Sequence, residues 1–240
     1  MPLTSPRDPC RVKENGAPER RIFMSRKPII LHFSFAENAQ GWIAGFADYP
    51  VGEEEFFELE SGIEPMPPDL GLVGKGFRLS GNNHSDDLFM FLKRRLGPED
   101  GVVPDTEYRF NFVLEFASNA PSGAVGIGGA PGESVFLKAG ASAREPKSVP
   151  VDGNLRMDVD KGNQAVGGPA ASSVGNIANG RPASEPPRYV LLRKEHQHPY
   201  NIRADRQGAV WLLIGTDSGF EGPTALYYRQ FRVELVPVNA

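Results

Sequence analysis

The run Asn82-Asn-His-Ser-Asp-Asp87 holds the densest group of chemically versatile side chains in this chain. In an extended segment Asn82, His84 and Asp86 project from one face, because successive side chains alternate. His84 with Asp86 can bind a metal ion, or act as a base with its orienting carboxylate. Asn and Asp also form turns and caps, so a purely structural role is the alternative.

A second polar run, Thr216-Asp-Ser-Gly-Phe-Glu-Gly222, follows a strongly apolar segment and is therefore expected at the edge of a sheet. Asp217 and Glu221 supply two carboxylates, and Phe220 supplies an aromatic ring that the turn is expected to expose. Paired carboxylates serve glycoside hydrolysis, and carboxylate oxygens also bind calcium. A plain hairpin loop is the third interpretation of this run.

Both runs begin where a strand is predicted to end, and a sandwich has loops at only two ends. Each run is a small polar turn with two acids beside an aromatic ring or a His, and this shared composition favours one common end. His84, Asp86, Asp217 and Glu221 would then crowd three carboxylates around one imidazole, with Phe220 as one wall. Replacing Asp86 and Asp217 with Asn is expected to weaken ligand or calcium binding and to leave the melting temperature nearly unchanged.

Aromatic residues among the turns offer a further binding surface. Trp42, Tyr49 and Phe220 can stack on sugar rings while neighbouring Asp and Asn side chains bond the hydroxyl groups. Trp42 can equally seal one end of the sandwich. The predicted ligand contacts lie in or near loops 45–55, 82–87 and 216–222: Trp42, Tyr49, Asn82, His84, Asp86, Asp217, Phe220 and Glu221.

Other motifs are less suited to chemistry. His196-Gln-His198 would place two imidazoles on one strand face, as a metal pair requires, yet the adjacent Lys194 and Pro199 favour an exposed loop. The glycine-rich segment 126–132 lacks the Gly-Lys-Ser/Thr of a phosphate-binding loop, and Gly-x-Ser-x-Gly is absent. Neither phosphate binding nor a nucleophile elbow is therefore expected.

An alternating segment indicates the class of the fold. Large apolar side chains occupy every second position, which puts them on one face of a strand: Tyr108, Phe110, Phe112, Leu114 and Phe116. The turn Val103-Pro-Asp-Thr106 before this strand is typical of the corner between the two sheets of an antiparallel sandwich. About nine strands separated by turns, without a convincing amphipathic helix, predict an all-β fold, an antiparallel jelly-roll-like β-sandwich.

We expect a single domain over residues 28–238, with a disordered basic arm at 1–27 and a loop-rich excursion at 139–187. Leu88–Leu92 is interpreted as a strand rather than a short helix. The closing segment is expected to put four side chains on one face: Tyr227, Phe231, Val233 and Leu235. The predicted core contains Phe33, Phe35, Tyr108, Phe110, Phe112, Leu114, Trp211, Leu213, Phe231 and Val233.

Charge and composition exclude several classes of function. The 240 residues carry a formal charge of −4, although residues 1–28 hold seven Lys or Arg against three Asp or Glu. The acid excess therefore lies in the rest of the chain, which argues against nucleic acid as a partner. No apolar run approaches the ~18 residues of a membrane helix, and no signal peptide is visible. Cys10 is the only cysteine, so no intrachain disulfide is expected.

The order of several short motifs gives the chain a family likeness. Phe33-Ser-Phe35 with Gly41-Trp42, the Pro-Asp-Thr corner and the closing segment 227–235 resemble the jelly-roll sandwiches of galactose-binding-like carbohydrate-binding modules. The middle of the chain, including Ser80–Phe91, resembles an uncharacterised bacterial family, many members of which look exported. This resemblance implies a fold and carries no established activity.

The same resemblance bears on calcium. The modules often hold a structural calcium ion with a loop after the first strand and an acid in the last strand. Glu37 fits the first of these positions, whereas Arg229 stands where an Asp is common. The candidate metal ligands are therefore Glu37, Asp86 and Asp217, and no other cofactor is indicated.

Three hypotheses for the function follow. The leading one is a non-catalytic binding module for a carbohydrate or another hydroxyl-rich ligand. The alternative is a glycoside hydrolase-like or metal-dependent hydrolase that uses His84, Asp86, Asp217 and Glu221. The third is a structural or surface-interaction domain without a small ligand. Catalytic carboxylates should lie ~5–10 Å apart across a cleft, whereas a binder should show a shallow groove.

Overall fold

The computed structural model describes residues 27–85 and 87–238. Apart from Lys27, the predicted N-terminal arm lies outside these residues, as does Asp86.

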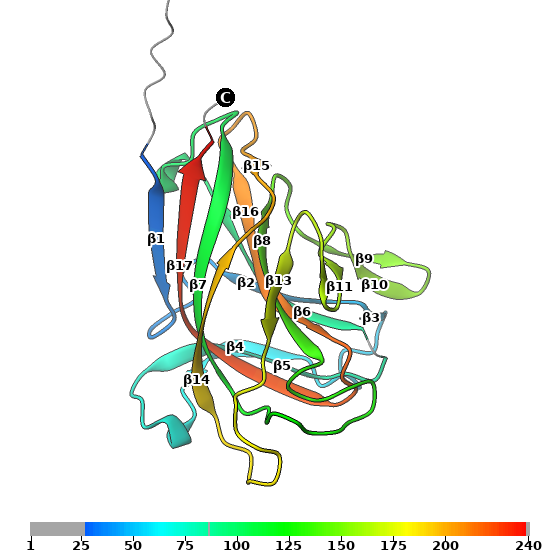
Figure 1. The fold of residues 1–240 in the computed structure, drawn as a ribbon. Coiled ribbons are helices and arrows are strands. Elements are labelled where there is room, and N and C mark those ends of the chain that lie inside the picture. The colour runs from blue at the N-terminus through cyan, green and yellow to red at the C-terminus, as the bar shows by residue number, and fades with distance from the viewer. Residues whose placement is uncertain (1–26, 86, 239–240) are drawn as a thin grey trace, which may run out of the picture.

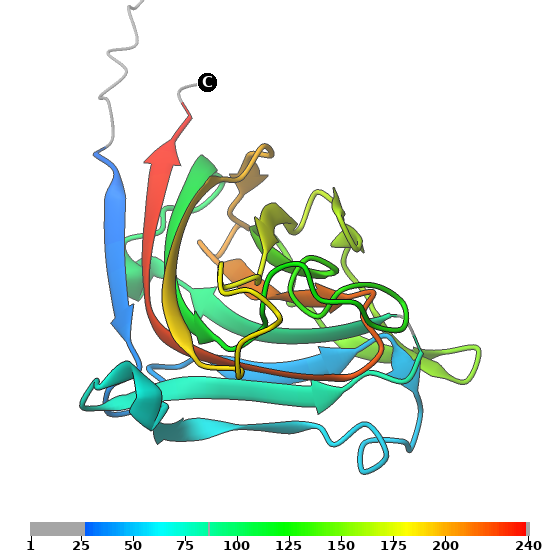
Figure 2. The same ribbon diagram turned by 60° about the horizontal axis from the view of Figure 1, so that its bottom comes forward.

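Two antiparallel sheets pack face to face, which confirms the predicted all-β sandwich (Figure 1). Sheet A runs in the order β14 (Val190–Gln197), β7 (Glu107–Ser118), β17 (Pro223–Pro237), β5 (Lys75–Asn82) and β4 (Glu60–Pro65), with β1 (Ile29–Ser34) also on β17 and β15 (Ile202–Arg203) also on β7. Sheet B runs β13 (Ser172–Asn176), β8 (Val135–Ser142), β16 (Val210–Ser218), β6 (Leu88–Leu96) and β2 (Ile43–Ala47). The segment at Leu88 is thus a strand, as predicted. Strands β7 and β17 bend along their length, so that sheet A wraps partly around sheet B (Figure 2).

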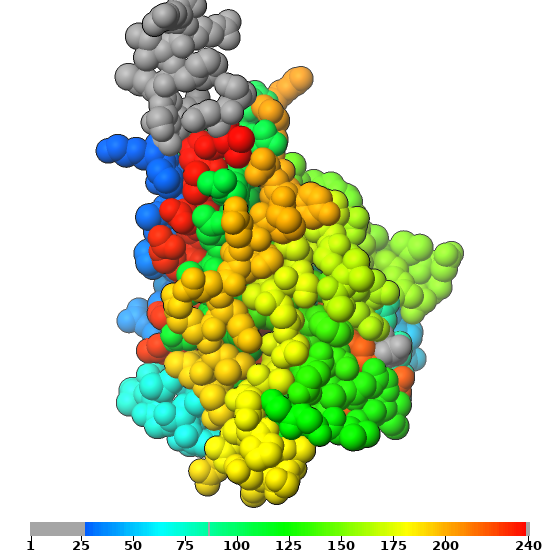
Figure 3. All heavy atoms as spheres, viewed as in Figure 1, coloured from blue at the N-terminus to red at the C-terminus, as the bar shows by residue number. Residues whose placement is uncertain are grey.

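The excursion at 139–187 is more ordered than its composition indicates. It contains the end of β8, the hairpin β9 (Ser148–Val151) and β10 (Asn154–Met157), the short pair β11 (Gly162–Asn163) and β12 (Val166–Gly167), and β13. Strand β10 also pairs with β3 (Tyr49–Pro50). Yellow-green atoms of this excursion spread across the front of the molecule, and the β9–β10 hairpin stands out at one side (Figure 3). The remaining elements are the 3-10 turns η1 (Pro68–Leu70) and η2 (Pro98–Asp100).

The main core lies between the two sheets, and it contains eight of the ten predicted core residues: Phe33, Phe35, Tyr108, Phe110, Phe112, Leu114, Phe231 and Val233. A second apolar cluster lies on the other face of sheet B, where Val159, Ala170 and Ala171 cover Phe89 and Phe91. Sheet B is therefore buried on both faces around Phe89, Phe91 and Leu213. Within the described residues, no helix has the length and apolar character needed to cross a membrane.

Strand β16 faces the opposite way from the prediction. Its Val210, Leu212 and Ile214 point into the main core, whereas Leu213 belongs to the second cluster and Trp211 is only partly buried. Because both faces of β16 are covered, apolar residues fill consecutive positions from Val210 to Ile214 and no alternation marks the inward side. Trp211 instead packs beside the ammonium group of Lys93, 5.6 Å from its ring centre.

A β-bulge corrects the prediction for the closing strand. The pairing of β17 with β7 shifts between Tyr228 and Gln230. The extra residue reverses the alternation, so Tyr228 is fully buried with Phe231 while Tyr227 lies on the outer face of sheet A. The face predicted to contain Tyr227 therefore contains Tyr228 instead.

The corner before β7 forms as predicted. The backbone N–H of Val103 donates a hydrogen bond to the Tyr108 hydroxyl at 2.9 Å, which ties the turn to the first inward side chain of the strand. This contact is the tyrosine corner of β-sandwiches.

Candidate functional site

The two polar runs of the sequence meet, and Asn83 joins them. Its side-chain amide donates hydrogen bonds to the carbonyl oxygens of Ser218 at 3.0 Å and Phe220 at 2.9 Å. Its backbone N–H donates to the carbonyl of Gly222 at 3.1 Å. The common end predicted for these loops is therefore present, but the residue that makes it is a buried amide that the sequence did not single out.

The predicted cluster around His84 does not form among the described residues. The His84 ring stacks on exposed Phe56 with 4.2 Å between ring centres. Glu221 pairs through its backbone with Ile127. The Asn82 amide donates to Glu58 at 3.0 Å. Of the predicted carboxylates, Asp217 instead lies beside Lys161, together with Asp48.

Asp217 lies inside strand β16 and is fully buried, which contradicts its expected place in a loop at the sheet edge. The Oδ2 atom accepts hydrogen bonds from the Lys161 ammonium at 2.9 Å and the Gln164 backbone at 2.8 Å. The Lys138 ammonium lies 3.5 Å from the same oxygen. Asp217 therefore faces the excursion that covers the outer face of sheet B.

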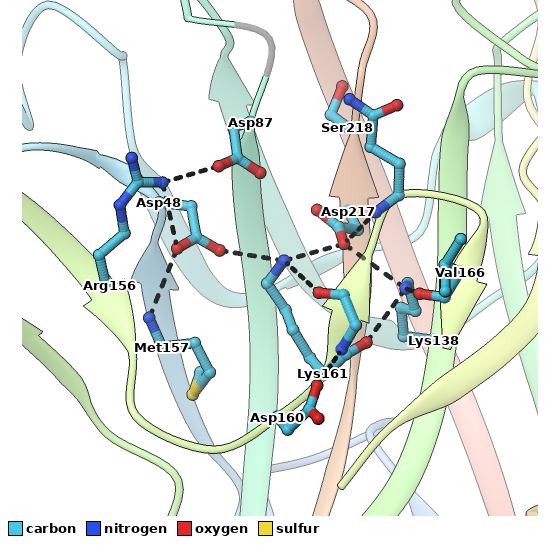
Figure 4. Close-up of polar contacts among 12 residues, drawn as sticks. Asp48, Asp87, Lys138, Arg156, Met157, Asp160, Lys161, Val166, Asp217 and Ser218 are labelled. Carbon is cyan, nitrogen blue, oxygen red and sulfur yellow. Dashed lines mark hydrogen bonds and ion pairs between the residues drawn. The ribbon is translucent and has the colours of Figure 1, made fainter. Parts of the chain in front are cut away.

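A chain of charges runs from this buried carboxylate to the surface (Figure 4). The Lys161 ammonium also lies 3.1 Å from Asp48, which in turn lies 3.6 Å from the Arg156 guanidinium. Arg156 donates to the carboxylate of Asp87 at 2.7 Å. The inner members are buried, whereas the Arg156 and Asp87 side chains are 42% and 32% exposed. The outer pair is thus held by buried partners and remains open to solvent.

Local backbone geometry brings these residues together. Asp48 follows β2 in the left-handed region, with φ of 64°, a conformation that Asp tolerates better than most residues. Its backbone N–H donates to the carbonyl of Leu155 in β10, and its carboxylate accepts from the backbone N–H of Met157 at 3.4 Å. The turn after β2 therefore docks the β10 strand that carries Arg156.

The electrostatics of the cluster follow from burial and charge. Burial, together with the neighbouring Asp48 and Asp217 charges, raises the pKa of Asp87 to about 6. Burial also lowers the pKa of Lys138. For Lys161 burial acts in the same direction, but Asp217 and Asp48 outweigh it and raise the pKa of this ammonium. Lys161 is therefore a fixed positive charge, and Asp87 is an acid that titrates near neutral pH.

These side chains surround an open cleft of about 310 Å³, which we call the Lys161 cleft. The polar groups of its lining are three carboxylates, a guanidinium, an ammonium and an amide: Asp48, Asp87, Asp160, Arg156, Lys161 and Asn163. Such a set can donate and accept several hydrogen bonds within a small space.

The predicted aromatic platform is wrong for two of its three residues. Trp42 is only 3% exposed and packs edge-on against Phe33 and Phe231 in the core. Tyr49 is also buried, and its hydroxyl donates to Glu54 at 3.3 Å. Phe220 is half-buried against the core. Among the described residues, Phe56 presents an aromatic ring to solvent at this end and is 58% exposed.

The structure gives limited support for the metal candidates. Within the described residues, no group of three or more His, Cys, Asp or Glu side chains is arranged to hold a metal ion. Glu37 is exposed in the turn after β1, and Asp217 already faces two ammonium groups, which would repel a cation. Calcium binding stays a prediction, and Asp217 is not expected among its ligands.

His196 and His198 lie on one face, as the sequence indicated, but His198 is buried rather than part of an exposed loop. The Ser172 hydroxyl lies 2.7 Å from His196 Nε2 and 2.8 Å from His198 Nδ1. His198 Nε2 donates to the carbonyl of Pro169 at 2.9 Å, so Nδ1 of this ring is the acceptor. The three side chains join the edge of sheet A to the edge of sheet B, and we call them the histidine clasp.

No protein-family model and no curated protein matches the chain. Among solved structures, the chain is similar to the CBM22-1 xylan-binding domain of Paenibacillus barcinonensis Xyn10C, with 14% identity, a TM-score of 0.38, and 87% of this chain and 95% of that one covered. It is also similar to TmCBM61, solved with β-1,4-galactotriose, with 8% identity, a TM-score of 0.36, and coverage of 80% and 86%. The mannan-recognising module TmCBM27 shows 11% identity, a TM-score of 0.33, and coverage of 87% and 98%.

Proposed function

We propose that this protein binds a carbohydrate without transforming it, and that the Lys161 cleft is the binding site. The observation that carries the proposal is the Asp87–Arg156 pair, which is partly exposed at the mouth of the cleft and held from behind by buried charges. Carboxylate and guanidinium groups are planar and offer several hydrogen bonds each, so together they match neighbouring sugar hydroxyls.

An aromatic surface close by in the chain supports the choice of a sugar. Phe56 and His84 stack on each other, and both are exposed. Phe56 follows β3 whereas Asp48 precedes it, and His84 lies in the same loop as Asp87. An exposed ring face suits the C–H face of a pyranose, while the cleft suits its hydroxyl groups. A binder with both features needs no large pocket, which agrees with the modest volume of the cleft.

The arrangement of the carboxylates favours binding over hydrolysis. The buried Asp217 is bonded to Lys161 and has no contact with solvent, so it is a poor candidate for an acid that must reach a substrate. Asp48 is buried between Lys161 and Arg156 in the same way. Asp87 is thus the partly exposed acid of the charge chain. The other accessible carboxylate of the cleft, Asp160, accepts a hydrogen bond from the backbone N–H of Gly162 at 2.9 Å.

A glycan array tests the proposal, with the folded state of the protein checked by circular dichroism. We expect hits among neutral or weakly charged glycans, and each hit should survive incubation without cleavage when examined by mass spectrometry. An array without hits from a folded preparation would contradict the binding function. Cleavage of a hit would instead establish the hydrolase alternative.

Two substitutions at the cleft mouth are expected to weaken binding of any hit. Asp87→Asn and Arg156→Gln each remove a charged hydrogen-bonding group, for a loss of affinity of roughly ten- to a hundredfold. The melting temperature should change little, because partly exposed ion pairs contribute about 0–1 kcal/mol. Calorimetric titration measures the affinity. The matched controls are Glu195→Gln and Arg193→Gln, an exposed ion pair on β14, which should leave binding unchanged.

A further inference from the structure

A second cavity, of about 510 Å³, lies where the loop before β4 passes the ends of β5 and β17. Figure 2 shows the start of β17 beside the end of β5, and Pro223 pairs there with Asn82. Four glutamates line this cavity, which we call the acidic groove: Glu54, Glu55, Glu58 and Glu60. The residues of the Lys161 cleft do not take part in it.

The charge of the acidic groove is largely uncompensated. Its single lining cation, Arg78, is already paired with Glu60 at 2.6 Å and with Glu64 at 3.5 Å. Within the part of the chain that the structure describes, the side-chain donors to Glu54 and Glu58 are neutral groups, the Tyr49 hydroxyl and the Asn82 amide. Across the described part of the chain, no salt bridge reaches Glu54, Glu55 or Glu58. The groove therefore presents net negative charge to a ligand.

An apolar pocket of about 240 Å³ adjoins the acidic groove. The two cavities share one wall, made of Asn119, Pro223, Thr224 and Ala225. The rest of the apolar pocket contains no charged residue and is formed mainly by proline rings and large apolar side chains: Pro121, Pro131, Pro187, Ile177 and Phe220. We call the two adjoining cavities together the depression, of which one half is negative and the other is apolar.

The shared wall contains a buried hydroxyl without a partner. Thr224 is only 7% exposed, and its Oγ1 atom makes no hydrogen bond. Buried polar groups are almost always hydrogen-bonded, because leaving one unpaired costs free energy. Thr224 lines both cavities, so a ligand seated across the wall lies beside this residue. The oxygen itself is shielded from solvent, and it gains a partner from a ligand only when the wall shifts to admit one.

We propose that this depression binds a peptide segment in which basic residues adjoin apolar ones. The cationic side chains would lie against Glu54, Glu55 and Glu58, the apolar side chains would enter the proline-lined pocket, and a backbone group would pair with the Thr224 hydroxyl. Taken together, the two cavities of about 510 and 240 Å³ have a volume within the range of known ligand sites, which is about 300–1,000 Å³. This site is separate from the carbohydrate site and does not depend on it.

The test is an NMR titration of the full chain with the peptide acetyl-Arg-Arg-Leu-Phe-amide. We expect shifts of the amide signals at residues 54–60, 119, 120, 224 and 225, with an affinity that falls as salt is added, because the glutamates are exposed. Acetyl-Glu-Glu-Leu-Phe-amide and acetyl-Arg-Arg-Ser-Ser-amide should each bind more weakly. Equal binding of all three peptides, shifts confined to other regions, or an absence of shifts would overturn the proposal.

Substitutions separate the charged half from the shared wall. The double variant Glu55→Gln and Glu58→Gln should bind the first peptide about tenfold more weakly, while the control pair Glu99→Gln and Glu195→Gln should bind it normally. Thr224→Val keeps the shape but removes the hydroxyl. It should weaken binding and raise the melting temperature, since it removes an unpaired buried group. A Thr224→Val protein with a lower melting temperature and unchanged binding would show that this hydroxyl serves the fold.

Discussion

Replacing Asp217 with Asn is expected to lower the free energy of unfolding by about 3–5 kcal/mol, because it leaves the buried Lys138 ammonium without a counter-charge and removes one of the two carboxylates that face Lys161. Asp217 and Lys138 are fully buried, and Lys161 is nearly so. For a chain of this size the loss corresponds to a fall in melting temperature of roughly 10 °C. Thermal and urea unfolding measure it. This expectation reverses the one from the sequence, in which Asp217 was a loop residue with little effect on stability.

Two further variants test whether the stability loss of Asp217→Asn comes from the buried charges. Glu221→Gln makes the same chemical change at a partly exposed position four residues away and should alter stability by no more than about 0.5 kcal/mol. Adding Lys138→Met to Asp217→Asn removes one charge of each sign, so the double variant should be more stable than Asp217→Asn alone. Additive losses in the double variant would show that the lysine and the aspartate are not coupled.

The histidine clasp is expected to make the fold sensitive to acid. Burial, with a smaller effect from His198, lowers the pKa of His196 from 6.5 to about 4, and burial also lowers the pKa of His198. Between pH 6.5 and about 4, His196 binds a proton in the unfolded chain more readily than in the folded one. The free energy of unfolding therefore falls as the pH drops through this range. At 1.36 kcal/mol per unit of pKa, and allowing for the partial exposure of His196, its share of the loss is about 2–3 kcal/mol.

Urea unfolding at a series of pH values measures this effect by difference. Asp87 acts in the opposite direction over part of the same range, because its raised pKa lets the folded state bind a proton first. The wild type is therefore compared with His196→Gln, which keeps a donor for Ser172 and does not titrate. We expect a shallower acid loss in this variant, and no such change in His32→Gln, an exposed histidine on β1. If the free energy of unfolding changed with pH in the same way in the wild type and in His196→Gln, the histidine clasp would not be the cause of the acid sensitivity.

The fold was predictable where one face of a strand is buried and the other is not. Tyr108 and the alternating residues of β7 indicated both the strand and its corner correctly. The same reasoning failed for β16, because a strand covered on both faces shows no alternation, and for β17, because the bulge after Tyr228 changes the alternation within one strand. The excursion was taken for loops because its short strands are rich in small and polar residues.

The candidate site was only partly predictable. Composition placed the two polar runs at one end correctly, and Asn83 shows why, since its amide bonds the backbone of the other run. The charge partners were not predictable, because Lys161 and Asp217 are 56 residues apart and meet only when the excursion folds over sheet B. No local pattern marks an ion pair of that kind, and the positive φ of Asp48 is visible only in the structure.

The pairing of β17 has a consequence for how the chain folds during synthesis. This strand pairs with β7 along most of its length, with β5 over its first half and with β1 over its second half. Before Pro237 has left the ribosome, β1 and β5 therefore lack the strand that joins them to β7, and their inward aromatic residues have no completed sheet to pack in. Such non-local pairing folds slowly, and incomplete sheets are prone to aggregate. The nascent chain should thus depend on chaperones that bind apolar segments until its last strand emerges.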